Sequence, residues 1–391
     1  MSFEKPYDGL KVLDLSQGVA GPYCAMLLGR HGADVIKVEP LEGDWSRRLM
    51  PAYGDNTAYS VSANIGKQSL ALDLKSDAGR EIIDRLAAEA DVFLEGFRPG
   101  VIERLGFDYE RLAALNKDLI YVSISGFGRE GPLRDKPAMD PVLQAFTGFM
   151  AENTGDGDTP IRTPVIINDM TTALYAHQAV AAALYARLGG AAGRRIDVSL
   201  MQASANLQTV RLMGGYRNGP FKPGFVPNGA FPTADGWLML LVLKDDDFRT
   251  LCDVLDDDAL TNDPRFIDAA GRLKNGDALI TKLRDILITQ PATHWRDKLT
   301  AAGLQNEVIQ TYRNFVDHPH VAASGLISWL VQPGDDDPWA VPNIPGVPPL
   351  VNGGDDAVAP RCGQHTRAVL SNLGYSDADI DTLADGKIIG L

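Results

Sequence analysis

The pattern of apolar and polar residues in the first third of the chain predicts short strands that alternate with helices. Apolar runs of strand length occur at residues 10–15, 35–39, 70–74, 92–95 and 119–124. Helical spacing of apolar residues follows at 22–30 and, after Ser76, at 77–89. Such alternation is typical of βαβ units around a parallel sheet. The pattern therefore predicts an α/β fold.

Further along the chain, the pattern of strands and helices is interrupted twice by segments rich in proline. Residues 194–199 predict one more strand, and a helix is expected from Leu200 to about Leu212. Around 218–232 prolines and glycines crowd together, including Pro220 and Pro223, which predicts a domain boundary near Asn218. Beyond it, a strand at 236–243 is followed by helical segments such as 278–289. A second proline-rich zone at 332–360 is expected to be a loop, before two short C-terminal helices.

Composition and charge narrow the function classes. The 391 residues carry a formal net charge of -14, which argues against general binding to nucleic acid or to a membrane surface. The sequence has no stretch of 18 uninterrupted apolar residues and no basic-then-apolar start of the kind that marks a signal peptide. Its three cysteines, Cys24, Cys252 and Cys362, are widely separated and form no CxxC pair. We therefore expect a cytoplasmic protein whose cysteines are packing or surface residues.

Asp169 is the most informative single residue, because it directly precedes an Ala-rich helical run, residues 171–188. Unpaired N–H groups and the helix dipole favour negative charge in the first turn of a helix. We therefore expect Asp169 to be ionised at neutral pH, as a carboxylate nucleophile must be. The structural alternative is that Asn168 and Asp169 only cap the helix, since both residue types are favoured at that position.

A phosphate-bearing ligand is suggested by the turn after the first strand. Gly18 and Gly21 lie in that turn and Glu39 ends the next strand, but the spacing does not match GxGxxG, so a nicotinamide or flavin site is disfavoured. Another adenine nucleotide fits, because a helix start after a parallel strand attracts phosphate. Basic residues at strand ends and in βα loops are its candidate contacts, although each is a surface charge by default: Lys37, Lys67, Lys75, Arg98, Arg104 and Lys136.

The sequence lacks the residue patterns of a metal site and of a serine hydrolase. His318 and His320 flank a proline and have no further ligand-like cluster nearby, so we expect no metal. Ser125-Gly126-Phe127-Gly128 offers only part of a GxSxG nucleophile elbow, which makes a hydrolase of that class improbable.

At the level of whole motifs, the chain resembles the class III CoA-transferases, which include formyl-CoA transferase and carnitine CoA-transferase, with alpha-methylacyl-CoA racemase as a cousin. The resemblance runs through nearly the whole chain. It is carried by 10–15 with Ala20-Gly21-Pro22, 32–39, 64–75, 98–106, Ser125–Gly128, Asp140 with Gln144, 193–195, 231–237, 317–319 and 363–366. So many ordered blocks make chance similarity very improbable.

The resemblance implies a fold and an assembly. A Rossmann-like large domain and a smaller α+β domain are joined by two linkers in a ring-shaped chain, and two such chains interlock as a homodimer. Our two proline-rich zones fit those linkers. The predicted domains are residues 1–218, the large CoA-binding domain with the catalytic aspartate, 219–330, the small domain, and 331–391, a return linker with C-terminal helices that pack on the large domain.

The resemblance also implies the site. The family's nucleophilic aspartate falls on Asp169, which makes capping a secondary role. The positions that match the family's CoA contacts are Val19, Ala20, Leu72, Asp73, Leu74, Lys75, Gly96, Phe97, Arg98, Arg104 and Lys136. Coenzyme A or acyl-CoA is the expected substrate, with a small organic acid as partner and no metal or redox cofactor.

The expected reaction moves CoA from a donor acyl-CoA to a free carboxylic acid. Asp169 attacks the donor to give a mixed anhydride, and the CoA thiolate then forms an aspartyl-CoA thioester. Backbone N–H groups at the start of the Asp169 helix or near glycine-rich turns are candidates for stabilising the oxyanions.

Departures from the family pattern leave alternatives open. The racemases carry a histidine where this chain has Met139, which disfavours racemase or epimerase activity. In formyl-CoA transferase a glutamine orients the substrate and an arginine follows the second strand, but this chain has Val19 and Pro40 at these positions. The glycine-rich loop of that enzyme has no strong counterpart at 215–229. These differences put formate and oxalate in doubt as substrates. An acyl-CoA-binding protein without turnover is the alternative outside enzymes.

The acid itself is not readable from the sequence. Trp45, Arg47 and Arg48 are candidates for the active-site entrance, where the arginines would suit a carboxylated substrate, although a surface role fits as well. Candidates for an apolar pocket, or simply for packing, are Tyr59, Met139 and Met213.

Overall fold

The structure is a computed structural model that describes residues 4–49, 51–154, 159–219 and 224–391. These residues form two compact units: Met1–Arg217 with Ala323–Leu391, and Asn218–Ala322. Pro220 and Pro223 of the predicted linker lie outside the described residues. The chain thus leaves the first unit near Asn218, crosses the second unit and returns.

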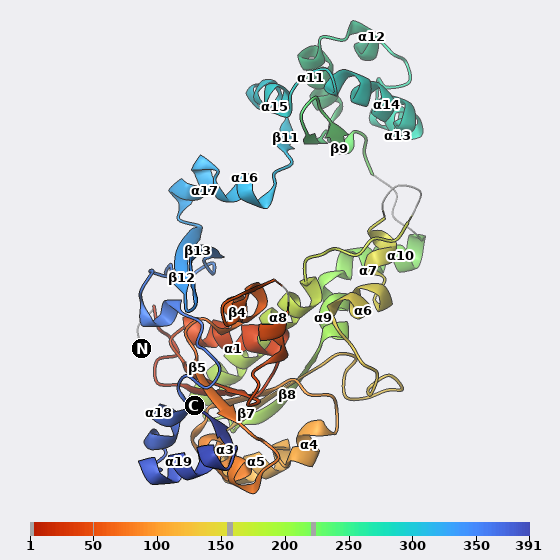
Figure 1. Cartoon of the computed structure of the whole chain (residues 1–391). Helices are drawn as coiled ribbons and strands as arrows, with labels where there is room; N and C mark the ends of the chain where they lie inside the picture. The colour runs from red at the N-terminus through yellow and green to blue at the C-terminus, as the bar shows by residue number, and fades with distance from the viewer. Residues whose placement is uncertain (1–3, 50, 155–158, 220–223) are drawn as a thin grey trace. The chain divides into compact units, whose positions relative to one another are not determined.

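A seven-stranded sheet in the order β14-β5-β2-β1-β6-β7-β8 is the centre of the first unit (Figure 1). Its strands are β1 (Lys11–Asp14), β2 (Asp34–Glu39), β5 (Gln68–Leu72), β6 (Val92–Glu95), β7 (Ile120–Ser125), β8 (Arg194–Ser199) and β14 (Ile389–Gly390). Neighbouring strands run parallel, except that β14 is antiparallel to β5. From β1 the chain winds outward through β2 to β5, returns to β6, and winds outward through β7 to β8. The predicted α/β fold with a parallel sheet is confirmed.

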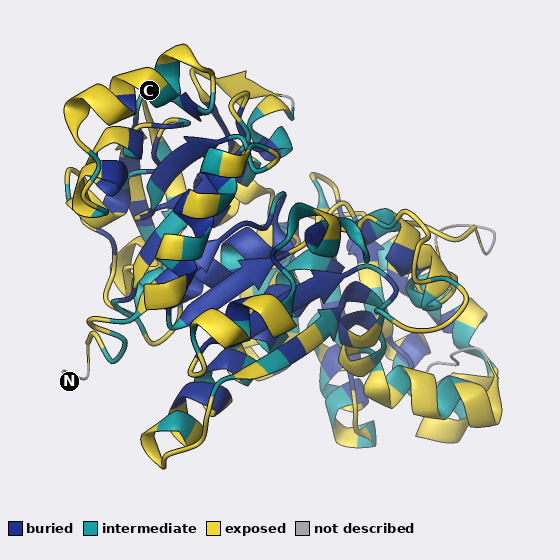
Figure 2. Ribbon diagram, turned by 90° about the horizontal axis from the view of Figure 1, so that it is seen from below, coloured by how far each residue is buried: buried dark blue, intermediate teal, exposed yellow. Residues whose placement is uncertain are grey.

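Two hydrophobic cores form because side chains alternate between the faces of each strand. On β1, Val12 packs with helices α1 (Ala20–Arg30) and α8 (Ile167–Leu188), whereas Leu13 packs on the opposite face with α3 (Asp77–Glu89). Figure 2 shows buried strands between helices whose outer faces are exposed. The near-continuous apolar runs in the sequence reflect strands that are covered on both faces.

The remaining elements of the first unit are short. Around the first half of the sheet lie η1 (Trp45–Arg48), β3 (Ala52–Tyr53), β4 (Asn56–Thr57), α2 (Ala58–Asn64), α4 (Val101–Leu105) and α5 (Tyr109–Leu115). Further along come α6 (Asp140–Phe146), α7 (Phe149–Glu152), η3 (Asp355–Ala357), α18 (Thr366–Asn372) and α19 (Asp377–Asp385). Ser76 caps α3 as expected, its hydroxyl accepting the Gly79 N–H at 3.0 Å.

Two expectations about local structure were wrong. The helix expected from Leu200 to about Leu212 is divided at Gln208 into α9 (Leu200–Leu207) and α10 (Thr209–Asn218). The zone expected to be a loop contains a strand, β13 (Asp335–Pro342), paired antiparallel with β12 (Ile327–Gln332). A two-stranded hairpin leaves one edge of each strand free, so prolines that lack an N–H donor are tolerated there.

The second unit combines a three-stranded sheet with helices. Its strands, in the order β11-β10-β9, are β9 (Asn228–Pro232), β10 (Trp237–Leu241) and β11 (Gln305–Val308). Its helices are α11 (Asp245–Leu255), α12 (Asp258–Thr261), α13 (Ala269–Lys274), α14 (Gly276–Leu287), α15 (Ala292–Ala301) and α16 (Tyr312–Val316), and α17 (Pro319–Ser324) leads back to the first unit. Among the described residues, no helix is long and apolar enough to cross a membrane.

Candidate active site

The winding of the sheet reverses between β1 and β6, and a pocket opens at the carboxyl ends of these strands. Ligands of open α/β sheets bind at such reversals. The pocket has a volume of about 470 Å³. Its lining comes from several loops of the first unit: Gln17, Val19, Ala20, Gly21, Trp45, Gly96, Phe97, Arg98, Pro99, Ile124, Ser125, Gly126, Arg134, Lys136, Ala138, Met139, Asp169 and Leu200.

Asp169 reaches this pocket from the first turn of α8. The residue that precedes this helix is Ile166, which makes no side-chain cap. The cap comes from another helix: the Asp140 carboxylate accepts the N–H groups of Asn168 at 2.6 Å and of Asp169 at 3.3 Å. The expectation that Asn168 and Asp169 cap α8 was wrong, because a buried carboxylate distant in sequence satisfies these donors.

Gln144 fixes Asp140 and the segment that leads into α8. Its side-chain amide donates to Asp140 Oδ1 at 2.6 Å and to the Thr163 carbonyl at 3.2 Å, and its oxygen accepts the Thr163 N–H at 3.1 Å. Asp140 and Gln144 are both buried. Through these hydrogen bonds the Asp169 backbone is held by side chains of α6.

The charge state of Asp169 differs from the expectation. Burial, together with the nearby Asp140 charge, raises the pKa of Asp169 to about 7. At neutral pH the carboxylate is therefore only partly ionised, which departs from the expectation of an ionised group. Desolvation and repulsion between like charges outweigh the helix dipole, whose N–H groups already serve Asp140.

The turn between β1 and α1 faces the pocket with backbone. Gly18 has a φ of +82°, a conformation that favours glycine. Gly21 packs against Ser16, so closely that a Cβ atom would lie 2.2 Å from the hydroxyl oxygen. Val19 precedes α1 without a side-chain cap, and Pro22 brings no N–H. The open N–H groups of this turn can bind anionic oxygen.

The loop after β6 forms another wall with Gly96, Phe97 and Arg98. Glu95, the last residue of β6, holds this loop by accepting the Phe97 N–H at 2.9 Å. Burial raises the pKa of Glu95 to about 7, against the opposing effects of hydrogen bonds from Ser123 and Phe97 and of the Arg129 charge. Arg98 is exposed, so its guanidinium is open to an anionic ligand.

A neighbouring pocket of about 330 Å³ collects the other predicted contacts. Leu72, Asp73, Leu74 and Lys75 line it, and it shares Gln17 and Phe97 with the pocket of Asp169. The two pockets therefore meet at these shared residues. Arg104 lines neither pocket and lies on α4 beside Gly100, as an exposed residue.

Three basic residues proposed as ligand contacts or entrance residues are instead bound inside the protein. Lys37 pairs with Asp44 at 2.9 Å and Lys67 with Asp14 at 2.8 Å, and all four side chains are at most 1% exposed. Arg47 pairs with Glu39 at 2.7 Å.

Glu39 also accepts hydrogen bonds from Ser69 and from the Asp44 N–H. Its carboxylate is therefore already engaged inside the protein. The spacing of apolar residues in the sequence could not show that these charged residues would be paired inside the protein.

The remaining candidates divide between the pocket and elsewhere. Trp45 and Met139 line the pocket of Asp169, whereas Tyr59 and Met213 do not. Arg48 is exposed and donates to the carbonyls of Glu42 and Gly43. Sequence reasoning missed several lining residues, whose only signal was their position after the carboxyl ends of strands: Gln17, Arg134, Ala138 and Leu200.

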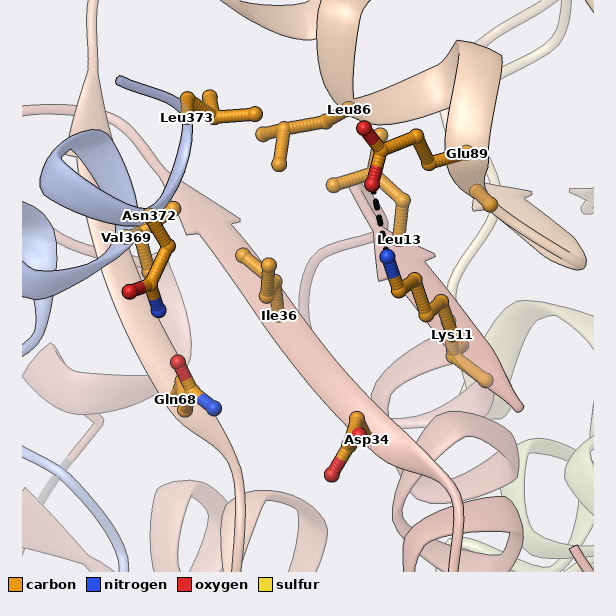
Figure 3. A pocket seen from close by; sticks show the side chains of 12 residues that line it. Lys11, Leu13, Asp34, Ile36, Gln68, Leu86, Glu89, Val369, Asn372 and Leu373 are labelled. Atoms are coloured by element: carbon orange, nitrogen blue, oxygen red, sulfur yellow. Dashed lines mark hydrogen bonds and ion pairs between the residues drawn. The ribbon is translucent and has the colours of Figure 1, made fainter. Parts of the chain in front are cut away.

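A separate pocket of about 240 Å³ lies at the opposite edge of the sheet. Figure 3 shows its strand residues Lys11, Asp34 and Gln68, which begin β1, β2 and β5. Its polar rim includes an ion pair between Lys11 and Glu89 at 2.7 Å. None of the predicted site residues lines this pocket. Within the described ranges, no cluster of three or more histidine, cysteine or acidic side chains is placed to hold a metal.

The chain is similar to known CoA-transferases over most of its length. Residues 7–366 match the family model of CoA-transferase family III. An acetyl-CoA:oxalate CoA-transferase of Acetobacter aceti is 35% identical over 359 residues, which cover 87% of this chain and 92% of that protein. A succinate–glutarate CoA-transferase of Agrobacterium fabrum is 34% identical over 395 residues, covering 94% and 96%.

A solved structure leads to the same family. A CAIB/BAIF family protein from Brucella suis has a TM-score of 0.85 and 30% identity, covering 95% of this chain and 100% of that one. Together with the family match over nearly the whole chain, this likeness shows that the protein is an enzyme that belongs to CoA-transferase family III.

Proposed function

We propose that this protein moves CoA from a donor acyl-CoA to a free carboxylic acid, with Asp169 as the covalent nucleophile. The observation that carries the proposal is the position of Asp169 in the pocket at the reversal of the sheet, opposite the backbone turn at Val19 and Ala20. A carboxylate in that place meets the thioester of a CoA ester whose nucleotide lies along the strand ends.

The chemistry proceeds through two anhydrides and one thioester. The Asp169 carboxylate attacks the donor acyl carbon and expels the CoA thiolate, which leaves a mixed anhydride. The thiolate then attacks the Asp169 carbonyl carbon, releases the donor acid as a carboxylate and forms an aspartyl-CoA thioester. The acceptor carboxylate repeats these steps in reverse order, so that Asp169 is regenerated as a carboxylate and no proton is gained or lost.

Coenzyme A would lie across the two adjoining pockets. We assign its nucleotide end to the pocket of Leu72–Lys75 and its thiol end to the pocket of Asp169, with Gln17 and Phe97 between them. Lys75, Arg98 and Lys136 are the cations that line these pockets among the predicted contacts, and phosphates require such charges. Arg104 would extend the basic surface beside α4 rather than line either pocket.

The oxyanion of each tetrahedral intermediate would be stabilised by the β1–α1 turn. The Asn168 and Asp169 N–H groups at the start of α8 already donate to Asp140. The amides of Val19, Ala20 and Gly21 have no such partner in the hydrogen-bond network of the described residues and line the pocket. Preorganised N–H donors of this kind stabilise developing negative charge.

We propose short dicarboxylic acids as the substrate class. The relatives described above are named for oxalate and for succinate and glutarate, which all carry two carboxylates. The replacements at Val19 and Pro40 count against oxalate itself but not against longer dicarboxylic acids. Arg134 supports the assignment, because it lines the pocket of Asp169 and its exposed ion pair with Asp135, at 3.3 Å, is weak. Its guanidinium is therefore open to a second carboxylate.

We also propose the interlocked, ring-shaped homodimer that the family resemblance implies. Exposed apolar side chains on α10 support a partner surface: Val210 is 84% exposed, Met213 63% and Tyr216 92%. Clustered apolar exposure of this kind marks interaction sites. The protein would act in the cytoplasm, which its free cysteines Cys24 and Cys252 support.

Acyl exchange measured by mass spectrometry tests the function. Purified protein is incubated with succinyl-CoA or acetyl-CoA and isotope-labelled free dicarboxylic acids. We expect labelled acyl-CoA to form with the wild type, and Asp169→Ala to lower the rate at least about 10³-fold, since the nucleophile is lost. Asp34→Ala, an acidic side chain at the opposite pocket, is the control and should retain activity.

Other outcomes would overturn parts of the proposal. Full exchange by Asp169→Ala would exclude the covalent mechanism. Deuterium uptake at the α-carbon without acid-to-acid transfer would indicate a racemase, and CoA binding without either reaction would indicate a binding protein. Exchange restricted to monocarboxylic acids would overturn the substrate class alone.

A further inference from the structure

A buried ion pair lies directly beneath the turn that faces Asp169. Lys37 at the middle of β2 and Asp44, which precedes η1, are joined at 2.9 Å, with side-chain exposures of 0% and 1%. Burial disfavours the charged form of Lys37, but the neighbouring carboxylates of Asp44, Asp14 and Glu39 outweigh it and keep its pKa above the ordinary value. Lys37 is therefore a charged group inside the protein.

Asp44 and Lys37 both bind the backbone of the β1–α1 turn. The Gly18 N–H donates to the two Asp44 carboxylate oxygens, at 3.1 Å each, and the Lys37 ammonium donates to the Ser16 carbonyl. The residues on either side of Gly18, Gln17 and Val19, line the pocket of Asp169. The ion pair thus binds the inner side of the turn, while the outer side of the turn lines the pocket.

Asp44 also fixes a second wall of the same pocket. Its carboxylate accepts the Ser46 N–H at 2.9 Å and so starts the helical turn that carries Trp45. The indole covers Gly18, where a Cβ atom would lie 2.4 Å from ring atom Cζ2. Trp45 lines the pocket as well, so one carboxylate sets the relative position of a ring and a backbone turn.

Stability alone does not account for this arrangement. A fully buried ion pair costs so much desolvation that well-packed apolar residues of similar size are often as stable or more stable. What the charges provide is a defined position for two backbone groups and a ring, and a misplacement of about 1 Å at a reacting centre can cost about 100-fold in rate. We infer that Asp44, held by Lys37, is a positioning residue that aligns the β1–α1 turn and Trp45 against Asp169 for acyl transfer.

The expected effect of the ion pair on the reaction rate rests on the proposed function. Its expected effect on the position of the β1–α1 turn does not. The test variant is Lys37→Met with Asp44→Asn, which removes both charges and leaves no unpaired one. The matched control is Arg272→Met with Asp245→Asn, which removes a pair between α13 and α11 of the second unit, at 2.7 Å with 2% and 44% exposure. Both variants keep an acceptor oxygen on the former aspartate.

Two readouts separate positioning from folding. By hydrogen exchange we expect the peptide that covers residues 16–21 to exchange faster in the test variant than in the control, at equal circular dichroism. In acyl exchange we expect kcat to fall at least about tenfold, by a larger factor than KM for the CoA ester rises, because the contacts at Leu72–Lys75 are untouched although Val19 and Ala20 move with the turn. Unchanged exchange of 16–21, or a kcat equal to that of the control, would overturn the inference.

A single substitution keeps the test open if the double variant does not fold. Gly18→Ala removes no charge but places a Cβ against Trp45 at a φ of +82°, so it should displace the turn and lower kcat in the same way. A Gly18→Ala enzyme with wild-type kcat would contradict the inference. Failure of the wild type to transfer any acyl group would count against the proposed function, and the hydrogen-exchange comparison would still decide the role of the pair.

Discussion

At the scale of single residues, the reactivity of Asp169 depends on two opposing surroundings. Burial together with the Asp140 charge raises the pKa of Asp169, the nucleophile that we propose, to about 7. Asp140 in turn binds the N–H groups that would otherwise favour the Asp169 charge. Asp169 is therefore only partly ionised at neutral pH and becomes fully ionised in mildly alkaline solution.

This balance predicts a rising pH profile. Because only the ionised form attacks, kcat/KM should increase about tenfold per pH unit well below pH 7 and level off above it. Asp140→Asn removes the repelling charge and keeps an acceptor oxygen, so the midpoint should move to lower pH. The measurement is kcat/KM for acyl exchange from pH 5 to pH 9.

Glu95 is the control for that profile, because burial raises its pKa to about 7 as well. If Asp169 governs the profile, Glu95→Gln should leave the midpoint in place. A midpoint that moves with Glu95→Gln and not with Asp140→Asn would assign the titration to the wall of the pocket instead.

At the scale of elements, the reactive groups are carried by the starts of helices and the ends of strands. The helical run at 171–188 was readable from its spacing, but α8 begins four residues earlier, at Ile167, so that Asp169 lies inside its first turn. The cap of this helix was not readable. Asp140 and Gln144 lie far from it in sequence, and no local pattern shows that they meet its first turn. The hairpin β12–β13 was missed for a related reason: its pairing, not its proline-rich composition, makes it a strand pair.

The hydrogen bonds from Asp140 and Gln144 to the start of α8, here called the clamp on α8, give a prediction at this scale. Gln144→Ala removes the partner of Asp140 Oδ1 and of the Thr163 N–H, so we expect a loss of stability of about 2 kcal/mol and a lower kcat. Gln332→Ala is a matched control, because Gln332 is equally buried and likewise bonds two backbone groups, Ala357 O at 3.0 Å and Ala359 N at 2.8 Å.

Urea unfolding and acyl exchange of the two variants distinguish the roles. Both should unfold at lower urea concentration, but only Gln144→Ala should lose turnover. Equal turnover in the two variants would mean that the clamp contributes to stability and not to the alignment of Asp169.

At the scale of the whole molecule, the chain leaves one compact unit and returns to it. This path is compatible with the linked rings that the family resemblance implies, and the exposed apolar residues of α10 are candidates for the partner surface. We expect light scattering during gel filtration to give twice the chain mass of 42.2 kDa. Tyr216→Asp with Val210→Asp should weaken the dimer, and a 42.2 kDa wild type would exclude the assembly.

The sequence by itself determined the α/β class, the order of most strands and helices and, through its motifs, the family and the residue proposed as nucleophile. These follow from local periodicity and from short motifs, which survive in any arrangement of the elements. The tertiary structure decided which charges lie inside. Lys37, Lys67 and Arg47 look like ligand-binding cations in the sequence but are bound to Asp44, Asp14 and Glu39.

The same holds for the charge state of Asp169 and for the cap of its helix. Burial and pairing depend on which distant segments meet, and desolvation and Coulomb energies change steeply over a few ångströms. No spacing within one segment encodes those distances, so they exist only once β1, β2, α6 and α8 have packed together.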